Sequence, residues 1–138
     1  MDSMGPADNN PSVITKRKID WVRYLLIALT IEKIIQHSFV TLAFYFNWGD
    51  IRSSVAVAPD ILMTLGAIVT LLFILSLWGM LKQQKWAINL IAALAIFDIL
   101  GEFIAQGKIG IEMNLSFLVA TVLLILTLIY RRRTSGAV

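Results

Sequence analysis

Residues 61–81 read ILMTLGAIVTLLFILSLWGML, a run of 21 residues without a single charged side chain. A helix needs about 17–25 apolar residues to cross the roughly 30 Å hydrocarbon layer of a bilayer. Because no water reaches the backbone inside that layer, such a run must pair its own backbone groups as an α-helix. The stretch therefore predicts one membrane-spanning helix.

Segments of similar length and composition recur along the chain. The expected helices cover about residues 21–46, 61–81, 86–105 and 113–130. The two later connections, 81–85 and 106–112, are short, and short connections join antiparallel neighbours in helix bundles. The longer link at 47–60 is expected to form a short turn at the membrane surface. We predict an all-α integral membrane protein folded as a four-helix up-down-up-down bundle.

Composition supports the membrane class. Of the 138 residues, 58% are hydrophobic and only 15% are charged, and the mean hydropathy is +0.78. Soluble domains carry about 25% charged residues, and so small a globule cannot bury so much apolar surface. Cysteine is absent, which excludes disulfides and thiolate metal sites. The expected organisation is a flexible polar tail over residues 1–15, a single membrane domain over 16–133 and a C-terminal tail over 134–138.

The basic residues are distributed unevenly across the expected bundle. Of the twelve Lys and Arg residues, nine fall on the side of both termini, two on the other side and one within the first helix. Because cytoplasmic loops are enriched in Lys and Arg, we predict cytoplasmic termini in the plasma membrane of a prokaryote. The same residues are suited to contact anionic lipid, so the high pI does not indicate nucleic-acid binding. The nine are Lys16, Arg17, Lys18, Arg23, Lys82, Lys85, Arg131, Arg132 and Arg133.

Ionisable side chains also occur inside the first and third helices, where each costs at least about 2.5–3.5 kcal/mol. The first helix contains TIEKIIQHSFVT (30–41) and the third contains FDILGEFIAQG (97–107). At a rise of about 1.5 Å per residue, the acids of the third helix lie level with the polar residues of the first. The predicted ligand- or proton-binding residues are Glu32, Lys33, Gln36, His37, Asp98 and Glu102.

Depth and charge balance together predict how these groups pair. A low-dielectric bundle cannot hold several ionised carboxylates without counter-charges. Asp98 is level with Lys33, and Glu102 is level with His37. We therefore predict a Lys33–Asp98 ion pair near the midplane and a His37–Glu102 pair nearer the outer face.

These two pairs leave one acid over. Glu32 is then expected to be protonated or hydrogen-bonded to Gln36, which lies one helical turn away. If Lys33 neutralises Glu32 instead, Asp98 becomes the proton-binding candidate. The alternative to a functional site is that these polar groups only hold the helices together through interhelical hydrogen bonds.

Small residues predict close helix contacts at two places. Gly66 with Thr70, and Gly101 with Ala105, are small side chains four residues apart. Such pairs let the backbones of neighbouring membrane helices approach closely. We expect both pairs to face another helix.

No sequence motif identifies a cofactor. The chain contains no P-loop, no Gly-rich dinucleotide turn and no HExxH sequence, so we predict no cofactor. Glu32, His37, Asp98 and Glu102 have acceptable ligand types for a metal. Lys33 in their midst opposes a cation, so no metal site is predicted. No catalytic residue is assigned.

The overall plan is similar to small bacterial and archaeal four-helix membrane families of unassigned function. A carboxylate in the first helix, Glu32, resembles the essential acid of small multidrug exporters, and acids inside a short bundle resemble membrane sterol isomerases. Neither likeness extends to a motif, and the further ionisable residues depart from the exporter pattern. The sequence assigns no family.

Three functions are therefore compared. The first is binding or transport of a proton, a cation or a small amphipathic ligand, with a homodimer expected because four helices are few for a pathway. The second is an accessory or structural subunit of a larger membrane complex. The third is a cofactor-free enzyme that moves a proton on a lipid-phase substrate. We rank the three functions in this order, so a binding or transport protein is favoured over an enzyme, with the lipid bilayer as its surroundings.

Overall fold

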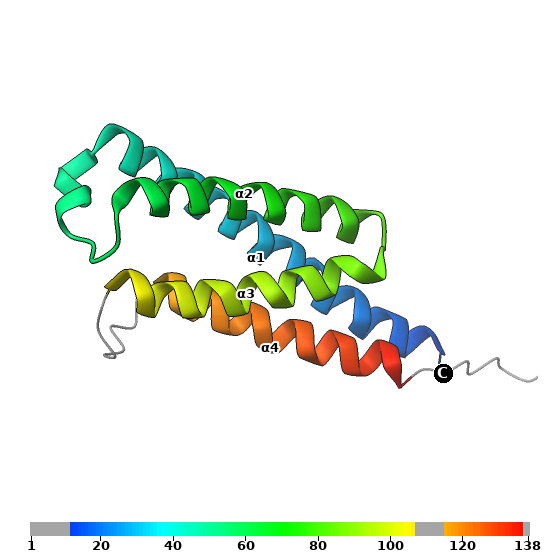
Figure 1. The fold of residues 1–138 in the computed structure, drawn as a ribbon. Coiled ribbons are helices and arrows are strands. Elements are labelled where there is room, and N and C mark those ends of the chain that lie inside the picture. Colours follow the sequence, from blue (N-terminus) through cyan, green and yellow to red (C-terminus); the bar gives the residue numbers. More distant parts are fainter. Residues whose placement is uncertain (1–11, 107–114, 137–138) are drawn as a thin grey trace, which may run out of the picture.

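The computed structural model describes residues 12–106 and 115–136, and over these it contains only helices. The long helices are α1 (Ser12–Phe46), α2 (Pro59–Leu81), α3 (Lys85–Gln106) and α4 (Leu115–Ser135), and a 3-10 helix, η1 (Trp48–Ser53), follows α1. Each long helix has the length and composition to cross a membrane. The predicted all-α four-helix bundle is confirmed (Figure 1).

The four helices alternate in direction along the chain. Each helix packs against the next, and α4 packs back against α1, so α1 and α3 occupy opposite corners of the bundle. The start of α1 and the end of α4 lie at the same end of the bundle, as Figure 1 shows. η1 and the loop after it lie at the opposite end. Side chains of α1 and α3 can therefore meet across the centre of the bundle.

Two helices extend beyond the predicted membrane segments. α1 begins at Ser12, so residues 12–15, which were expected within a flexible tail, are helical. α4 continues to Ser135 instead of ending near Tyr130. A hydropathy pattern locates the part of a helix that crosses lipid, whereas the backbone hydrogen bonds of that helix can continue into water. Residues 1–11, 107–114 and 137–138 lie outside the described parts.

The connection between α2 and α3 is short and tightly packed. Between α2 and α3 the chain turns through Gln83 at a φ of 57°, and the amide of Gln84 donates to the carbonyl of Gly79 at 2.8 Å. A Cβ at Gly79 would lie 2.7 Å from the ring of Trp86 and 2.8 Å from the Cβ of Ala87. Only glycine therefore allows α3 to start so close to the end of α2.

The longer link after α1 is the expected short turn, formed here by η1. Asn47, Gly49 and Asp50 all have φ values between 52° and 65°, a region that glycine, asparagine and aspartate enter most easily. The guanidinium of Arg52 donates to the carbonyl of Phe44 at 2.8 Å, which ties η1 back to the end of α1. Beyond η1, the amide of residue 56 donates to the carbonyl of residue 105 at 3.3 Å, so the loop also contacts the end of α3.

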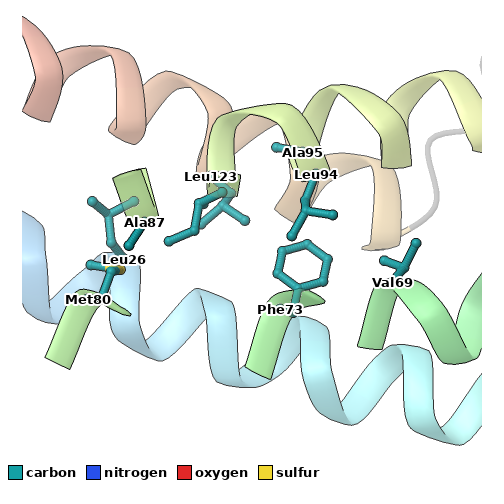
Figure 2. Close-up of a cluster of buried hydrophobic side chains, with 9 residues drawn as sticks. Leu26, Val69, Phe73, Met80, Ala87, Leu94, Ala95 and Leu123 are labelled. Atoms are coloured by element: carbon teal, nitrogen blue, oxygen red, sulfur yellow. The ribbon is translucent and has the colours of Figure 1, made fainter. Parts of the chain in front are cut away.

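The core is narrow and runs along the bundle axis. Leu26, Phe73, Ile91 and Leu123, one from each long helix, are completely buried. Figure 2 shows Phe73 and Leu94 pointing toward each other between α2 and α3. Large apolar side chains also cover the outside, and those exposed in the middle of the helices include Ile35 (64%), Leu71 (66%) and Ile125 (51%). Such an apolar exterior is what a lipid environment requires.

Candidate functional site

One face of α1 carries polar groups into the centre of the bundle. Leu26, Thr30 and Lys33 are all 0% exposed, and His37 continues the same line one turn further on. The hydroxyl of Thr30 donates to the carbonyl of Leu26 at 2.7 Å, so it is satisfied within its own helix. Lys33 cannot be satisfied in that way, because its ammonium extends several bonds from the backbone. Its partners come from elsewhere in the bundle.

The ammonium of Lys33 is surrounded by acceptors. Its Nζ lies 2.9 Å from Oδ2 of Asp98 and 3.0 Å from Oε1 of Gln36. On α4, the backbone carbonyl of Ser116 lies 3.0 Å away and its hydroxyl 3.1 Å away. Four acceptors for three N–H donors leave none of the donors unsatisfied. The predicted Lys33–Asp98 ion pair is confirmed, and the lysine links α1, α3 and α4.

Asp98 receives a second partner from α1. Nε2 of His37 lies 2.9 Å from Oδ1 of Asp98 and 3.2 Å from Oδ2, while the Asp98 side chain is only 5% exposed. The imidazole also stacks on Phe73 of α2, with ring centroids 5.6 Å apart and an interplanar angle of 25°. The expected partner of His37 was Glu102, and this expectation is wrong. Asp98 lies between the levels of Lys33 and His37, so one carboxylate serves both.

Gln36 also has a different partner from the one considered for it. Its carbonyl oxygen accepts from Lys33, and Oε2 of Glu32 receives no hydrogen bond from its amide group. Oε2 of Glu32 is buried and has no hydrogen-bond partner among the described residues. Within the described part of the chain, no cation lies within ion-pairing distance of Glu32. Glu32 therefore has no paired cation among the described residues, although the His37–Glu102 pair from which the charge balance predicted this does not form.

Glu102 lies one turn beyond Asp98 on α3 and is partly buried. All six predicted residues thus lie on α1 or α3, but Glu102 does not pair with His37. Over the described ranges, the His, Asp and Glu side chains do not converge in groups of three suited to hold a metal ion. The chemistry available at this cluster is that of one buried ion pair, one imidazole and additional carboxyls.

Ser116 is the residue of the cluster that the sequence did not predict. It provides two of the acceptors around Lys33, yet in the sequence it stands out only as part of Asn114-Leu115-Ser116, a glycosylation pattern. The depth of Ser116 in the membrane could have predicted this role. Counted along antiparallel helices, a hydroxyl at the start of α4 lies level with the later turns of α1.

The two small-residue pairs differ in their surroundings. A Cβ at Gly66 would lie 2.7 Å from Oγ1 of Thr41, so α2 does approach α1 closely there. A Cβ at Gly101 would meet no described atom within 4 Å. The prediction of close helix contact is therefore confirmed for Gly66 and wrong for Gly101 within the described chain.

Comparison with known proteins adds no functional assignment. No protein family matches the chain, and no curated protein or solved structure matches it. The function must therefore be argued from the cluster itself.

Proposed function

We propose that this chain is a small polytopic membrane protein that binds, and can translocate, a proton at the cluster between α1 and α3. The observation that carries the proposal is Oε2 of Glu32, a buried carboxyl oxygen without a hydrogen-bond partner among the described residues. An ionised carboxylate in such surroundings is costly unless it is paired. A protonated carboxyl avoids that cost, so Glu32 is the group on which we place the proton.

The neighbouring charges support this assignment. Lys33 follows Glu32 directly in the sequence, but its ammonium is fully occupied by Asp98, Gln36 and Ser116. It therefore provides no hydrogen bond that would hold Glu32 ionised. The imidazole of His37, bonded to Asp98, is a second group at the cluster that can gain or lose a proton. Two groups five residues apart on one helix thus provide two positions near the cluster at which a proton can be held.

The proton is the best supported of the ligands considered. Side chains fill the space around Lys33, with acceptor atoms at 2.9–3.1 Å. A larger ligand would have to displace these contacts, and a metal cation would meet the positive charge of the ammonium. A proton needs neither a cavity nor a counter-ion.

We extend the proposal to orientation and assembly. Arg23, Lys85 and Arg131 lie at the end of the bundle where α1 starts and α4 ends. By the bias of Lys and Arg toward the cytoplasm, we propose cytoplasmic termini in a prokaryotic plasma membrane. Four helices are few for a complete pathway, so we also propose a homodimer or a larger membrane complex as the working form.

Infrared difference spectroscopy across a pH titration tests where the proton is held. We expect the carbonyl stretch of a protonated carboxyl in the reconstituted wild type and its loss in Glu32→Gln. Glu102→Gln is the matched control, because it removes an acid of the same type one helix away and should keep the band. A band that survives in Glu32→Gln but disappears in Glu102→Gln would show that the proton is held elsewhere.

Proton movement is tested separately in vesicles that contain a pH-sensitive dye. A potassium diffusion potential should drive dye-reported proton flux with the wild type and not with Glu32→Gln. Equal flux in the two proteins would contradict a role of Glu32 in translocation, even if Glu32 holds the proton seen in the spectra.

A second function, that of an accessory or structural subunit, is favoured by one observation. Lys33, Asp98, His37 and Ser116 satisfy one another within the chain, as groups that only hold a bundle together would do. If Glu32→Gln and Asp98→Asn both leave proton binding and flux unchanged, this second function replaces the first.

A further inference from the structure

A cavity lies at the end of the bundle where α1 starts and α4 ends. It is a partly open hollow of about 560 Å³, bounded by α1, the turn between α2 and α3, the first turn of α3 and the last turns of α4. Its size is typical of small-molecule sites, which measure roughly 300–1,000 Å³. Neither Glu32 nor Asp98 lines this cavity, so it is a different site from the proposed proton cluster and does not depend on it.

The walls of the cavity carry positive charge from three helices. Arg23 of α1, Lys85 of α3 and Arg131 of α4 line it, and among the residues whose side chains the structure describes no Asp or Glu does. Among the described residues, neither Lys85 nor Arg131 forms an ion pair. Three cations around one space, with no described acid among them, produce a positive potential that attracts an anion. The cavity is therefore suited to hold an anion.

Arg23 has a fixed position in the wall. Its Nη2 donates to the backbone carbonyls of Met80 at 3.2 Å and Leu81 at 3.4 Å, at the end of α2. These bonds add to the backbone bond that the carbonyl of Met80 already accepts from the amide of Gln83 at 3.0 Å, at a helix end where carbonyls lack partners within the helix. They also hold the guanidinium at the rim without using all five of its N–H donors. Arg23 can therefore bind an anion with little further loss of side-chain freedom.

The remaining lining fits an amphiphile rather than a simple ion. Tyr130 and Asn89 provide groups that can hydrogen-bond to phosphate or glycerol oxygens, and Met80 and Ile88 provide an apolar wall. The cavity is at the end of helices that are suited to cross a membrane, so it lies at the depth of lipid headgroups. A phosphate group on an apolar chain has the chemistry that this lining recognises.

We propose that this cavity binds the phosphate group of an anionic phospholipid, with Arg23, Lys85 and Arg131 as its ligands. The shared chemistry is a phosphate ester, which can come from a lipid headgroup or from a soluble metabolite. The position of the cavity at the membrane surface favours the lipid. Binding there would link all four helices at one end of the bundle.

Two double variants with the same change in charge provide the test. Lys85→Gln with Arg131→Gln removes two cations that line the cavity. Lys82→Gln with Arg132→Gln removes two cations from the same end of the bundle that do not line it. Each protein is purified in neutral detergent and titrated with phosphatidylglycerol, with phosphatidylcholine and with glycerol phosphate. Native mass spectrometry measures bound lipid, and the melting temperature measures stabilisation.

We expect the wild type to retain phosphatidylglycerol in preference to phosphatidylcholine. The cavity variant should bind it about 30-fold more weakly, because it lacks two basic residues and each contributes about fivefold to the binding of an anionic lipid. The control variant should stay within about twofold of the wild type. Both variants should melt like the wild type when no acidic lipid is present, which excludes misfolding as the cause.

Three other results are informative. Equal weakening in both variants would overturn the proposal, because the attraction would then be a diffuse property of the basic surface. An absence of phosphatidylglycerol and glycerol phosphate binding in the wild type would also overturn it. Glycerol phosphate binding that is lost only in the cavity variant, without lipid binding, would support the phosphate site and contradict the lipid as its source.

Discussion

The ammonium of Lys33 lies 2.9 Å from a carboxylate oxygen of Asp98, and this ion pair joins two helices at opposite corners of the bundle. The Lys33 side chain is 0% exposed and that of Asp98 5% exposed. At this burial, water cannot solvate either charge when its partner is removed. Its contribution is therefore most visible when one partner is removed.

Lys33→Met should destabilise the protein strongly. The substitution keeps the length of the side chain but strands Asp98, and breaking a buried pair in this way typically costs about 3–5 kcal/mol. The bond from His37 to Asp98 remains, so the loss is expected toward the lower part of that range. Thermal unfolding in detergent measures it. Lys33→Met combined with Asp98→Leu should recover much of the loss, and an unchanged melting temperature in the single variant would contradict the pairing.

Gly66→Ala should loosen the contact between α1 and α2. The new methyl group would lie 2.7 Å from Oγ1 of Thr41, and overpacking of this kind costs about 1–3 kcal/mol. Gly101→Ala is the matched control, because its Cβ meets no described atom within 4 Å. The comparison uses melting temperatures under identical conditions.

Adding Thr41→Ala to Gly66→Ala should restore stability, because it removes the atom responsible for the clash. That hydroxyl oxygen is buried without a hydrogen-bond partner among the described residues, so its loss breaks no bond seen there. If the double variant is no more stable than Gly66→Ala alone, the clash with Thr41 is not the cause.

Acid should weaken the turn formed by η1. The pKa of Asp50 is lowered from its ordinary value of 3.8 by hydrogen bonds from Ser53 and then Asn47. A group with a lowered folded-state pKa stabilises the fold above its ordinary pKa, and that stabilisation is lost as the pH falls through the lower value. Amide exchange over residues 47–54, corrected for the chemical exchange rate, should therefore accelerate as the pH falls below about 4.

Asp50→Asn is the control for that experiment. Asparagine tolerates the positive φ of 58° found at this position and does not titrate. The corrected exchange rates of the variant should change little over the same pH range. A variant that responds to acid as the wild type does would assign the effect to another group.

Labelling with a membrane-impermeant maleimide tests the orientation. The chain has no cysteine, so each introduced thiol is the only one. Ala56→Cys, in the exposed loop after η1, should react from outside intact cells. Ser135→Cys, exposed at the end of α4, should react only after the membrane is opened. The reverse pattern would contradict cytoplasmic termini.

Hydropathy was sufficient to predict the architecture because the length of an apolar run corresponds to the thickness of a bilayer. Charge balance was sufficient for Lys33 and Asp98, since few other arrangements neutralise both. The partner of His37 could not be predicted, because depth along a helix is known from the sequence only to about one turn. The contribution of Ser116 was missed for a related reason. Which helices become neighbours around the bundle is decided by packing, and that information is spread over many apolar residues.

The cavity at the basic end was equally inaccessible to sequence reasoning. Arg23, Lys85 and Arg131 look like the other residues of a cytoplasmic basic cluster, and Arg131 has two neighbours of the same kind. Only the three-dimensional arrangement of the helix ends shows which of these cations line the cavity and which do not. The same charges that predict topology thus contain a subset with a separate expected role.

The link from Lys33 to Asp98 has a consequence for biosynthesis. The first helix leaves the ribosome long before the fourth, so its ammonium enters the bilayer when neither Asp98 nor Ser116 has yet been synthesised. A lone cation at that depth is unfavourable by several kcal/mol. The position of α1 in the membrane should therefore become stable only after α3 has brought Asp98, and a chain truncated before α3 should remain a substrate for quality-control proteases.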